Sequence, residues 1–247
     1  MEIAPGIHHF DTGPFNWYVL EEGGRLTLVD AGFPAHYSVF RKGIRSLGRE
    51  LKDVEAILLT HSHADHTGFA ERLRKETKAP VFVHSADLAA IGKVLQLPWW
   101  GLLSNAWRPY IATMLLTATV NGIFTMPFII NARTFGDGDV LDVPGRPRVL
   151  HAPGHTPGEV AFYLPERKVL ISGDTLLTRN LMTGELGNRR FSFHPGTVGS
   201  TAHTRRPELR VLVERIDLFR SGRAKAAAAE GGGCLLHAGG AEDPEFR

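Results

Sequence analysis

Short apolar runs alternate with polar stretches that contain glycine and proline, a pattern typical of a chain rich in β-strands. In the first half, the runs that predict strands are 17–22, 25–30, 54–60 and 81–84. Gly23 and Gly24 separate the first two runs, which is a hairpin signal. Apolar residues at helical spacing predict helices over 36–47, 67–78 and 86–95.

The second half repeats this order of elements. Strands are predicted over 148–151, 160–164 and 168–172, and a helix that begins with a proline is predicted over 207–219. Two strand-rich halves with helices between them favour an α/β sandwich over a single doubly wound sheet, in one domain that covers residues 1–247. The alanine- and glycine-rich residues 221–247 predict a low-complexity C-terminal segment.

One long segment, between Arg108 and Arg133, contains no charged residue. Roughly 20 uncharged residues are enough to span a bilayer, but several threonines and a proline interrupt the apolar character here. We therefore expect residues 98–133 to form an apolar, lid-like insertion, with membrane contact through residues 109–132 as the alternative. The aromatic residues expected to line a substrate lid are Trp99, Trp100 and Trp107.

Composition narrows the classes of protein to consider. The 28 basic and 26 acidic residues give a formal net charge of +2, and the basic residues are scattered, so we expect no nucleic-acid partner. The single cysteine, Cys234, excludes an internal disulfide and a paired-cysteine metal site. Residues 1–20 lack the basic start and apolar stretch of a secretory signal, so we expect a cytoplasmic protein. The unusual feature is a total of twelve histidines, several of them close together.

Three histidines and an aspartate directly follow the predicted strand 54–60. They lie in the run His61-Ser62-His63-Ala64-Asp65-His66. Imidazole nitrogens and carboxylate oxygens are ligands that suit zinc, with iron or manganese as close alternatives. Residues i and i+2 of an extended loop point the same way, so His61 and His63 can chelate one ion while Asp65 and His66 face a neighbouring position.

Two later segments place further donors after predicted strands. His155 lies in Gly-His-Thr-Pro-Gly, and Asp174 lies in Ser-Gly-Asp-Thr. With these motifs, the HxHxDH run and Asp30 in Leu-Val-Asp-Ala-Gly, the chain resembles the metallo-β-lactamase-fold superfamily over about residues 1–200. The resemblance implies a four-layered αββα sandwich with two zinc ions at one edge, iron or manganese being alternatives.

The resemblance also implies a role for each of these residues. The implied ligands of the first ion are His61, His63 and His155, and those of the second ion are Asp65, His66 and the bridging Asp174. Asp30 is implied to orient ligands from behind through hydrogen bonds.

The family's last ligand is a histidine in a Gly-His-Gly turn, and this chain departs from that pattern. Its matching segment is Cys234-Leu-Leu-His237-Ala-Gly-Gly, where the histidine comes two residues earlier than the family's frame. His237 is the candidate for this ligand, and His194 and His203 are the alternatives.

These features together favour a hydrolase that uses a metal-bound hydroxide to attack a carbonyl. Asp65, as a ligand of the second ion, is the expected catalytic proton carrier, and no Gly-x-Ser-x-Gly nucleophile elbow is present. The best-known zinc β-lactamases of the superfamily carry cysteine where this chain has Asp174. We therefore expect a small-molecule ester, lactone or thioester with an apolar tail as the substrate.

Three alternatives stay open at this point. The first is a β-lactamase-type amide hydrolase, which would use the same metal chemistry. The second is an oxidoreductase similar to sulfur dioxygenases, with one iron, if the second metal position is incomplete. The third is a metal-binding protein that catalyses no reaction. Fold alone does not separate them, because one fold hosts many chemistries.

Overall fold

The first half of the chain forms a seven-stranded sheet whose spatial order follows the sequence. Its strands are β1 (Glu2–Ala4), β2 (Ile7–Asp11), β3 (Asn16–Glu22), β4 (Arg25–Val29), β5 (Val54–Leu58), β6 (Val81–His84) and β7 (Arg133–Phe135). The strands from β1 to β4 pair antiparallel, whereas those from β4 to β7 pair parallel. The computed structural model describes residues 1–12, 15–91, 104–125, 128–179, 186–190 and 210–212.

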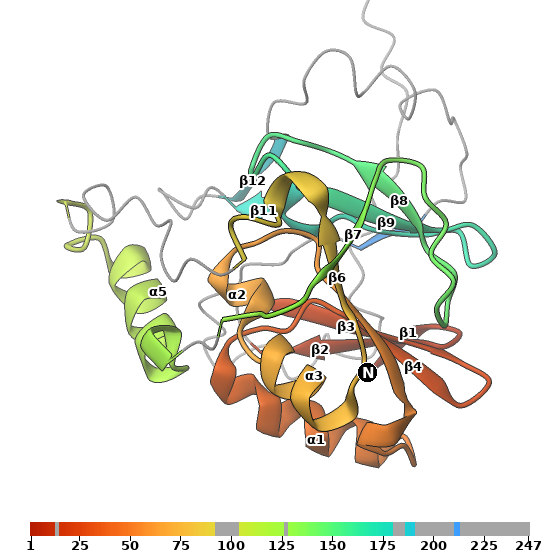
Figure 1. Ribbon diagram of the computed structural model, residues 1–247. Coiled ribbons are helices and arrows are strands. Elements are labelled where there is room, and N and C mark those ends of the chain that lie inside the picture. The colour runs from red at the N-terminus through yellow and green to blue at the C-terminus, as the bar shows by residue number, and fades with distance from the viewer. Residues whose placement is uncertain (13–14, 92–103, 126–127, 180–185, 191–209, 213–247) are drawn as a thin grey trace, which may run out of the picture.

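A second sheet faces the first (Figure 1). It has four strands in the order β13-β10-β9-β8, which are β8 (Arg148–His151), β9 (Val160–Leu164), β10 (Val169–Ile171) and β13 (Arg210–Leu212). A separate antiparallel pair is formed by β11 (Leu176–Arg179) and β12 (Leu186–Arg190). The two large sheets meet at one edge, where the Val160 amide donates to the Thr60 carbonyl oxygen at 2.9 Å.

Helices connect the strands and cover the outer face of the large sheet (Figure 1). The α-helices are α1 (Tyr37–Ser46), α2 (Ala64–Thr67), α3 (Ala70–Thr77) and α5 (Pro109–Val120). The 3-10 helices are η1 (Pro34–His36), η2 (Leu51–Asp53), η3 (Ser85–Asp87), η4 (Ile123–Thr125) and η5 (Gly173–Thr175). The α-helix α2 and the 3-10 helix η5 carry residues of the candidate site.

Strand β3 shows how the sequence builds two cores at once. Trp17 and Val19 pack on the helix side with α1 and α3, whereas Tyr18 and Leu20 pack on the other side against residues of the second sheet such as Phe162. Successive side chains of a strand point to opposite faces, so a strand buried on both faces is apolar without interruption. Burial of each such large side chain stabilises the fold by roughly 1.5–3 kcal/mol.

The predicted fold class is therefore confirmed: helices and two mixed sheets form an α/β sandwich. The described residues supply one helix layer and both sheets. A fourth layer, of helices over the second sheet, stays a prediction, and the C-terminal segment 221–247 lies outside the described residues.

Two predicted helices differ from the structure. Within the predicted helix 207–219, Arg210–Leu212 forms strand β13, which pairs parallel with β10. Its backbone groups find their partners on the edge of β10, and such a long-range partner is invisible in a short sequence window. The helix predicted over 86–95 is replaced by η3 and turns up to residue 91, and residues 92–95 lie outside the described ranges.

The uncharged segment forms α5 and η4, and α5 lies to one side of the sandwich (Figure 1). Ala118 and Ile123 pack there with Phe15 and Phe33, and this cluster also touches Ala64. Within the described ranges, no helix has the length and apolar character needed to cross a bilayer.

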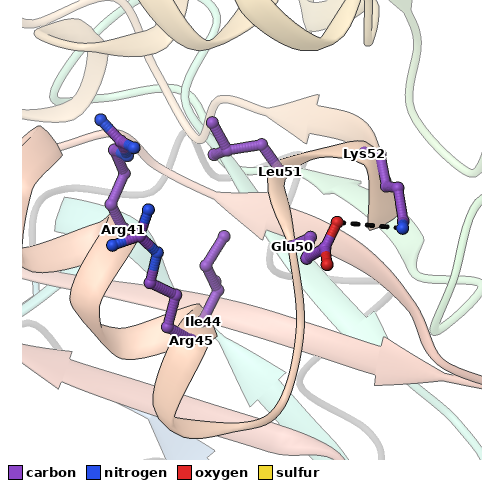
Figure 2. A pocket seen from close by; sticks show the side chains of 6 residues that line it. All are labelled: Arg41, Ile44, Arg45, Glu50, Leu51 and Lys52. Carbon is purple, nitrogen blue, oxygen red and sulfur yellow. Dashed lines mark ion pairs between the residues drawn. The ribbon is translucent and has the colours of Figure 1, made fainter.

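A surface pocket of about 430 Å³ lies at the end of α1 (Figure 2). Its lining residues are Arg41, Ile44, Arg45, Glu50, Leu51 and Lys52. The ion pair between Glu50 and Lys52, 2.9 Å long, joins side chains that are 68% and 74% exposed. None of the candidate site residues lines this pocket, so it plays no part in the site described next.

Candidate metal centre

The candidate site residues follow the carboxyl ends of strands from both sheets. Asp30 follows β4, His61 follows β5, His155 follows β8 and Asp174 follows β10. The carboxyl ends of the parallel strands β4 and β5 meet at one edge of the large sheet. The contact between Thr60 and Val160 brings the second sheet to the same edge. Side chains that are up to 144 residues apart in sequence (30 to 174) are thereby gathered in one place.

Two groups of potential metal ligands form at this edge. The first group is His61, His63 and His155, and the second is His61, His66 and Asp174; within each group the ligand atoms all lie within 4.8 Å of one another. In the first group, His155 Nε2 lies 2.8 Å from His63 Nδ1. Three convergent imidazoles are a donor set that suits zinc or another first-row divalent metal.

The Asp174 carboxylate belongs to the second group and also lies close to a histidine of the first. Its Oδ2 is 3.2 Å from His155 Nε2, and its Oδ1 is 3.4 Å from His66 Nε2. Each carboxylate oxygen therefore faces a histidine of a different group, which is the arrangement that a carboxylate shared by two cations requires.

Asp30 orients His66 directly and His61 through Thr60, by hydrogen bonds on the side away from the ligand groups. Its Oδ2 accepts a hydrogen bond from the Thr60 hydroxyl at 2.9 Å and is paired with His66 Nδ1 at 2.9 Å. The Thr60 hydroxyl donates its single proton to Asp30, so Thr60 Oγ1 accepts a hydrogen bond from His61 Nδ1–H at 3.1 Å. Both rings are then held with Nδ1 protonated and Nε2 facing the site, as a metal-binding histidine requires.

Two buried polar atoms at the centre lack hydrogen-bond partners within the described part of the chain, as expected of atoms that coordinate a metal ion. His61 is fully buried, and its Nε2 has no hydrogen-bond partner among the described residues. Asp174 Oδ1 is likewise buried without a well-formed hydrogen bond in this part of the chain. Buried polar atoms without partners are rare because each costs free energy, and a coordinated cation would remove that cost here. The residues present therefore fit a metal centre.

At His61, His63 and Asp174, the electrostatics of the group favour the protonation states that metal ligands need. Burial lowers the pKa of His61 and of His63, so both rings are held neutral. Burial alone would raise the pKa of Asp174, but His66 and His155 outweigh it and hold this pKa well below its usual range. His66 is the opposite case, because the carboxylates of Asp30, Asp65 and Asp174 outweigh its burial and raise its pKa.

Asp65 lies on the more open side of the group. Its Oδ2 is 3.7 Å from His66 Nε2, and its side chain is 28% exposed, against 2% for His66. Asp65 thus combines proximity to the second ligand group with access to solvent.

Sequence reasoning missed two polar residues of this centre, Thr60 and Glu159. The Glu159 side chain is fully buried; its Oε1 accepts from the Asp174 amide at 3.0 Å, and its Oε2 lies 3.4 Å from His61 Nδ1. Burial, with the Asp174 charge as the next cause, raises the pKa of Glu159 well above its usual range. The sequence does contain a signal for Glu159. It is a carboxylate that directly follows Gly-His-Thr-Pro-Gly and directly precedes the apolar run Val160–Leu164.

Several predicted site residues are not part of this geometry. His237, with the alternatives His194 and His203, and the lid residues Trp99 and Trp100 lie outside the described residues. Trp107 is described and is 76% exposed, with the Arg108 guanidinium 5.2 Å from its ring centroid. Its assignment to a substrate lid stays a prediction.

Comparison with known proteins identifies the family. The family model described as "Metallo-beta-lactamase superfamily" matches residues 11–217, which include every described candidate ligand. The chain belongs to the metallo-beta-lactamase superfamily. This membership confirms the resemblance that the HxHxDH run and its companion motifs predicted.

Relatives within the metallo-beta-lactamase superfamily include proteins and solved structures. "Probable metallo-hydrolase YqgX" of Bacillus subtilis is 26% identical over 81% of this chain and 89% of its own length. The metallo-beta-lactamase family protein TTHA1429 of Thermus thermophilus is 30% identical, with a TM-score of 0.56 over 77% of this chain and 65% of that one. TTHA1623, solved in a di-iron-bound form, is 28% identical, with a TM-score of 0.54 over 84% of this chain and 91% of that one.

The chain is shorter than some of these superfamily relatives. It covers 65% of TTHA1429 and 66% of another Bacillus subtilis protein, "Probable metallo-hydrolase YflN", which is just under two thirds of each. YflN is 25% identical to this chain over 72% of this chain.

Proposed function

We propose that this chain is a metal-dependent hydrolase that holds two divalent cations, zinc being the first candidate. The observation that carries the proposal is the pair of ligand groups that share His61 and are joined by Asp174, whose two oxygens face His155 and His66. A cation pair sharing ligands at one open-edged site is a recurrent hydrolytic arrangement. Membership of the metallo-beta-lactamase superfamily supports hydrolysis as the reaction class.

The described residues divide into two sets of proposed ligands. The first cation would be held by His61, His63 and His155; the second would be held by His66, Asp65 and Asp174, with His237 as a further proposed ligand. When bound, such cations lower the pKa of coordinated water far below that of bulk water, toward roughly 7, and polarise a substrate carbonyl oxygen.

Two further residues orient the ligands, and one of the ligands also moves protons. Asp30 and Thr60 fix the tautomers of His61 and His66 through the hydrogen bonds given above. Asp65, half-buried beside His66, is the proposed carrier that takes a proton during attack and returns it to the leaving group. No serine or cysteine nucleophile is needed for this reaction.

We further propose an ester, lactone or thioester with an apolar tail as the substrate. The cluster that joins Ala118 and Ile123 of the insertion to Phe33 also touches Ala64, the neighbour of Asp65, which supports an apolar surface beside the site. Exposed apolar side chains continue along the insertion, among them Leu116 and Phe124. An acyl tail would gain about 25 cal/mol for each Å² of apolar surface that it buries there.

Iron is the second candidate metal. Histidine and carboxylate donors also suit iron, and TTHA1623, at 28% identity, is a di-iron structure. An iron-loaded centre would favour an oxidoreductase similar to sulfur dioxygenases over a hydrolase.

Metal analysis combined with a substrate panel tests the proposal. The protein, purified without chelators, is analysed for zinc, iron and manganese, and assayed against p-nitrophenyl esters, lactones, thioesters and a β-lactam. We expect two zinc ions per chain and ester, lactone or thioester turnover that chelation removes and zinc restores. One iron per chain with oxygen consumption, or turnover of the β-lactam alone, would overturn the proposed substrate class. Full turnover by the His63→Ala variant would overturn the site.

A further inference from the structure

A buried carboxylate outside both ligand groups, Asp87, connects the loops that carry the histidines. Asp87 ends η3, directly after β6, and is 1% exposed. Its Oδ2 accepts hydrogen bonds from the Ser62 amide at 3.0 Å and from the Thr156 hydroxyl at 2.8 Å. Its Oδ1 accepts from the Gly158 amide at 2.7 Å. All three donors belong to other segments of the chain.

These three donors lie beside candidate ligands. Ser62 stands between His61 and His63, and Thr156 follows His155 directly. The two loops come from different sheets, so no shared strand fixes their relative position. Three nitrogens can coordinate one cation only if both loops are held in register, because coordination distances tolerate deviations of about 0.2 Å. The Asp87 carboxylate accepts hydrogen bonds from both loops and so links them.

Gly158 provides an independent observation. A Cβ atom at this position would lie 2.6 Å from Asp87 Cγ and 2.7 Å from Asp87 Cβ. Real Cβ atoms do not approach neighbouring atoms that closely, so the last glycine of Gly-His-Thr-Pro-Gly leaves the space into which Asp87 fits. The short hydrogen bond to the Gly158 amide depends on this close approach.

We propose that Asp87 is a positioning residue of the metal centre: its carboxylate clamps the His61–His63 loop to the His155 loop in the arrangement that the first cation needs. This inference rests on the metal site of the proposed function. The clamp needs a carboxylate, because both oxygens must accept. An asparagine of the same size would present an N–H to the amide of either Ser62 or Gly158, each of which is itself a donor.

The test measures metal binding by the full chain, without substrate. Zinc affinity is determined by chelator competition, and the electronic spectrum of the cobalt-loaded protein reports ligand geometry. We expect Asp87→Asn to weaken zinc binding by about 10- to 100-fold, as the loss of outer partners of metal ligands does in other sites, and to alter the cobalt spectrum. Thr156→Val removes one of the three donors and should cause a smaller loss, whereas Thr156→Ser keeps the hydroxyl and should bind as wild type does.

Glu71→Gln is the matched control. Glu71 is also fully buried and accepts hydrogen bonds, from Arg74 and the Ile130 amide, but it contacts none of the candidate ligands that the structure describes. This variant should lower the urea midpoint of unfolding while zinc affinity and the cobalt spectrum stay unchanged.

Each outcome separates this inference from the proposed function. If the wild-type protein binds zinc and Asp87→Asn has the same zinc affinity and the same cobalt spectrum, the clamp is overturned and the proposed function stands. Wild-type protein that binds no metal would overturn both. If Asp87→Asn does not fold, Thr156→Val decides: unchanged affinity and an unchanged cobalt spectrum in that variant would overturn the clamp.

Discussion

The substitution Asp30→Asn probes how the protein sets the protonation of its candidate ligands. Asp30 has a φ of 61°, in the left-handed region that asparagine also tolerates, so the exchange adds no backbone strain. It also preserves size. The change is confined to one carboxylate oxygen, which becomes an amide nitrogen.

Three hydrogen bonds set the size of the effect. Asp30 accepts from the Thr60 amide at 2.8 Å, from the Thr60 hydroxyl at 2.9 Å, and from His66 Nδ1 at 2.9 Å. If the new amide nitrogen faces His66, the proton of that ring moves to Nε2, the atom that faces Asp174. If the amide turns over, its N–H meets the N–H of Thr60. Loss of such an outer partner weakens metal binding by about 10- to 100-fold, or about 1.4–2.8 kcal/mol.

The assay measures the zinc affinity of the protein and the tautomer of His66. Chelator competition gives the two zinc dissociation constants, and ¹⁵N NMR of the histidines shows which ring nitrogen of His66 carries the proton. We expect the weaker constant to rise in Asp30→Asn. In the metal-free variant, at a pH high enough for the His66 ring to be neutral, we expect its single proton on Nε2 instead of Nδ1. The control Thr60→Ser, which keeps the hydroxyl, should bind as wild type does. Unchanged constants with His66 still protonated at Nδ1 would refute the role of Asp30.

Further predictions concern the bridge, the insertion and an acid-sensitive histidine. Asp174→Ala should empty the second zinc position before the first, and calorimetry that still shows two sites would contradict the bridge. Trp107→Ala should raise KM for long-chain acyl esters more than for short ones, because the exposed ring is available to an apolar tail; equal changes would remove Trp107 from the substrate lid. Burial lowers the pKa of His36 to about 4, while its neutral Nδ1 accepts from the Phe33 amide at 3.1 Å. The unfolded chain therefore takes up the proton at a higher pH, near 6.5. The contribution of His36 to the stability of the metal-free protein should accordingly be complete above pH 6.5 and be lost toward pH 4. Urea unfolding should therefore show a shallower fall over this range for His36→Gln, and an equal fall in that variant would contradict this.

The parts of the site that the sequence could predict are those that follow directly from strand ends. The apolar run before His61 ends where the donors begin, and His155 and Asp174 each follow the end of a strand by a few residues. Strands that pack into a sandwich bring such ends to one edge. The order of strands in the large sheet could be anticipated for the same reason, because neighbours in sequence are neighbours in space.

The parts that escaped prediction depend on partners far away in the chain. Thr60 acts on Asp30 across 30 residues, and Asp87 bonds to Thr156 across 69. A polar residue with such a partner looks like any loop residue in a local window. The helix predicted over 207–219 failed in the same way, because residues 210–212 find their hydrogen-bond partners on β10.

The most direct test of the central claim is a crystal structure of the zinc-saturated protein with anomalous diffraction measured at the zinc edge. We predict two anomalous peaks: one among the ring nitrogens of His61, His63 and His155, and one beside His66, with Asp174 in contact with both. An imidazole nitrogen of His237 at roughly 2.0–2.1 Å from the second peak would add that residue as a ligand. No peak at this edge of the sheets, or a single peak that Asp174 does not touch, would contradict a two-metal centre.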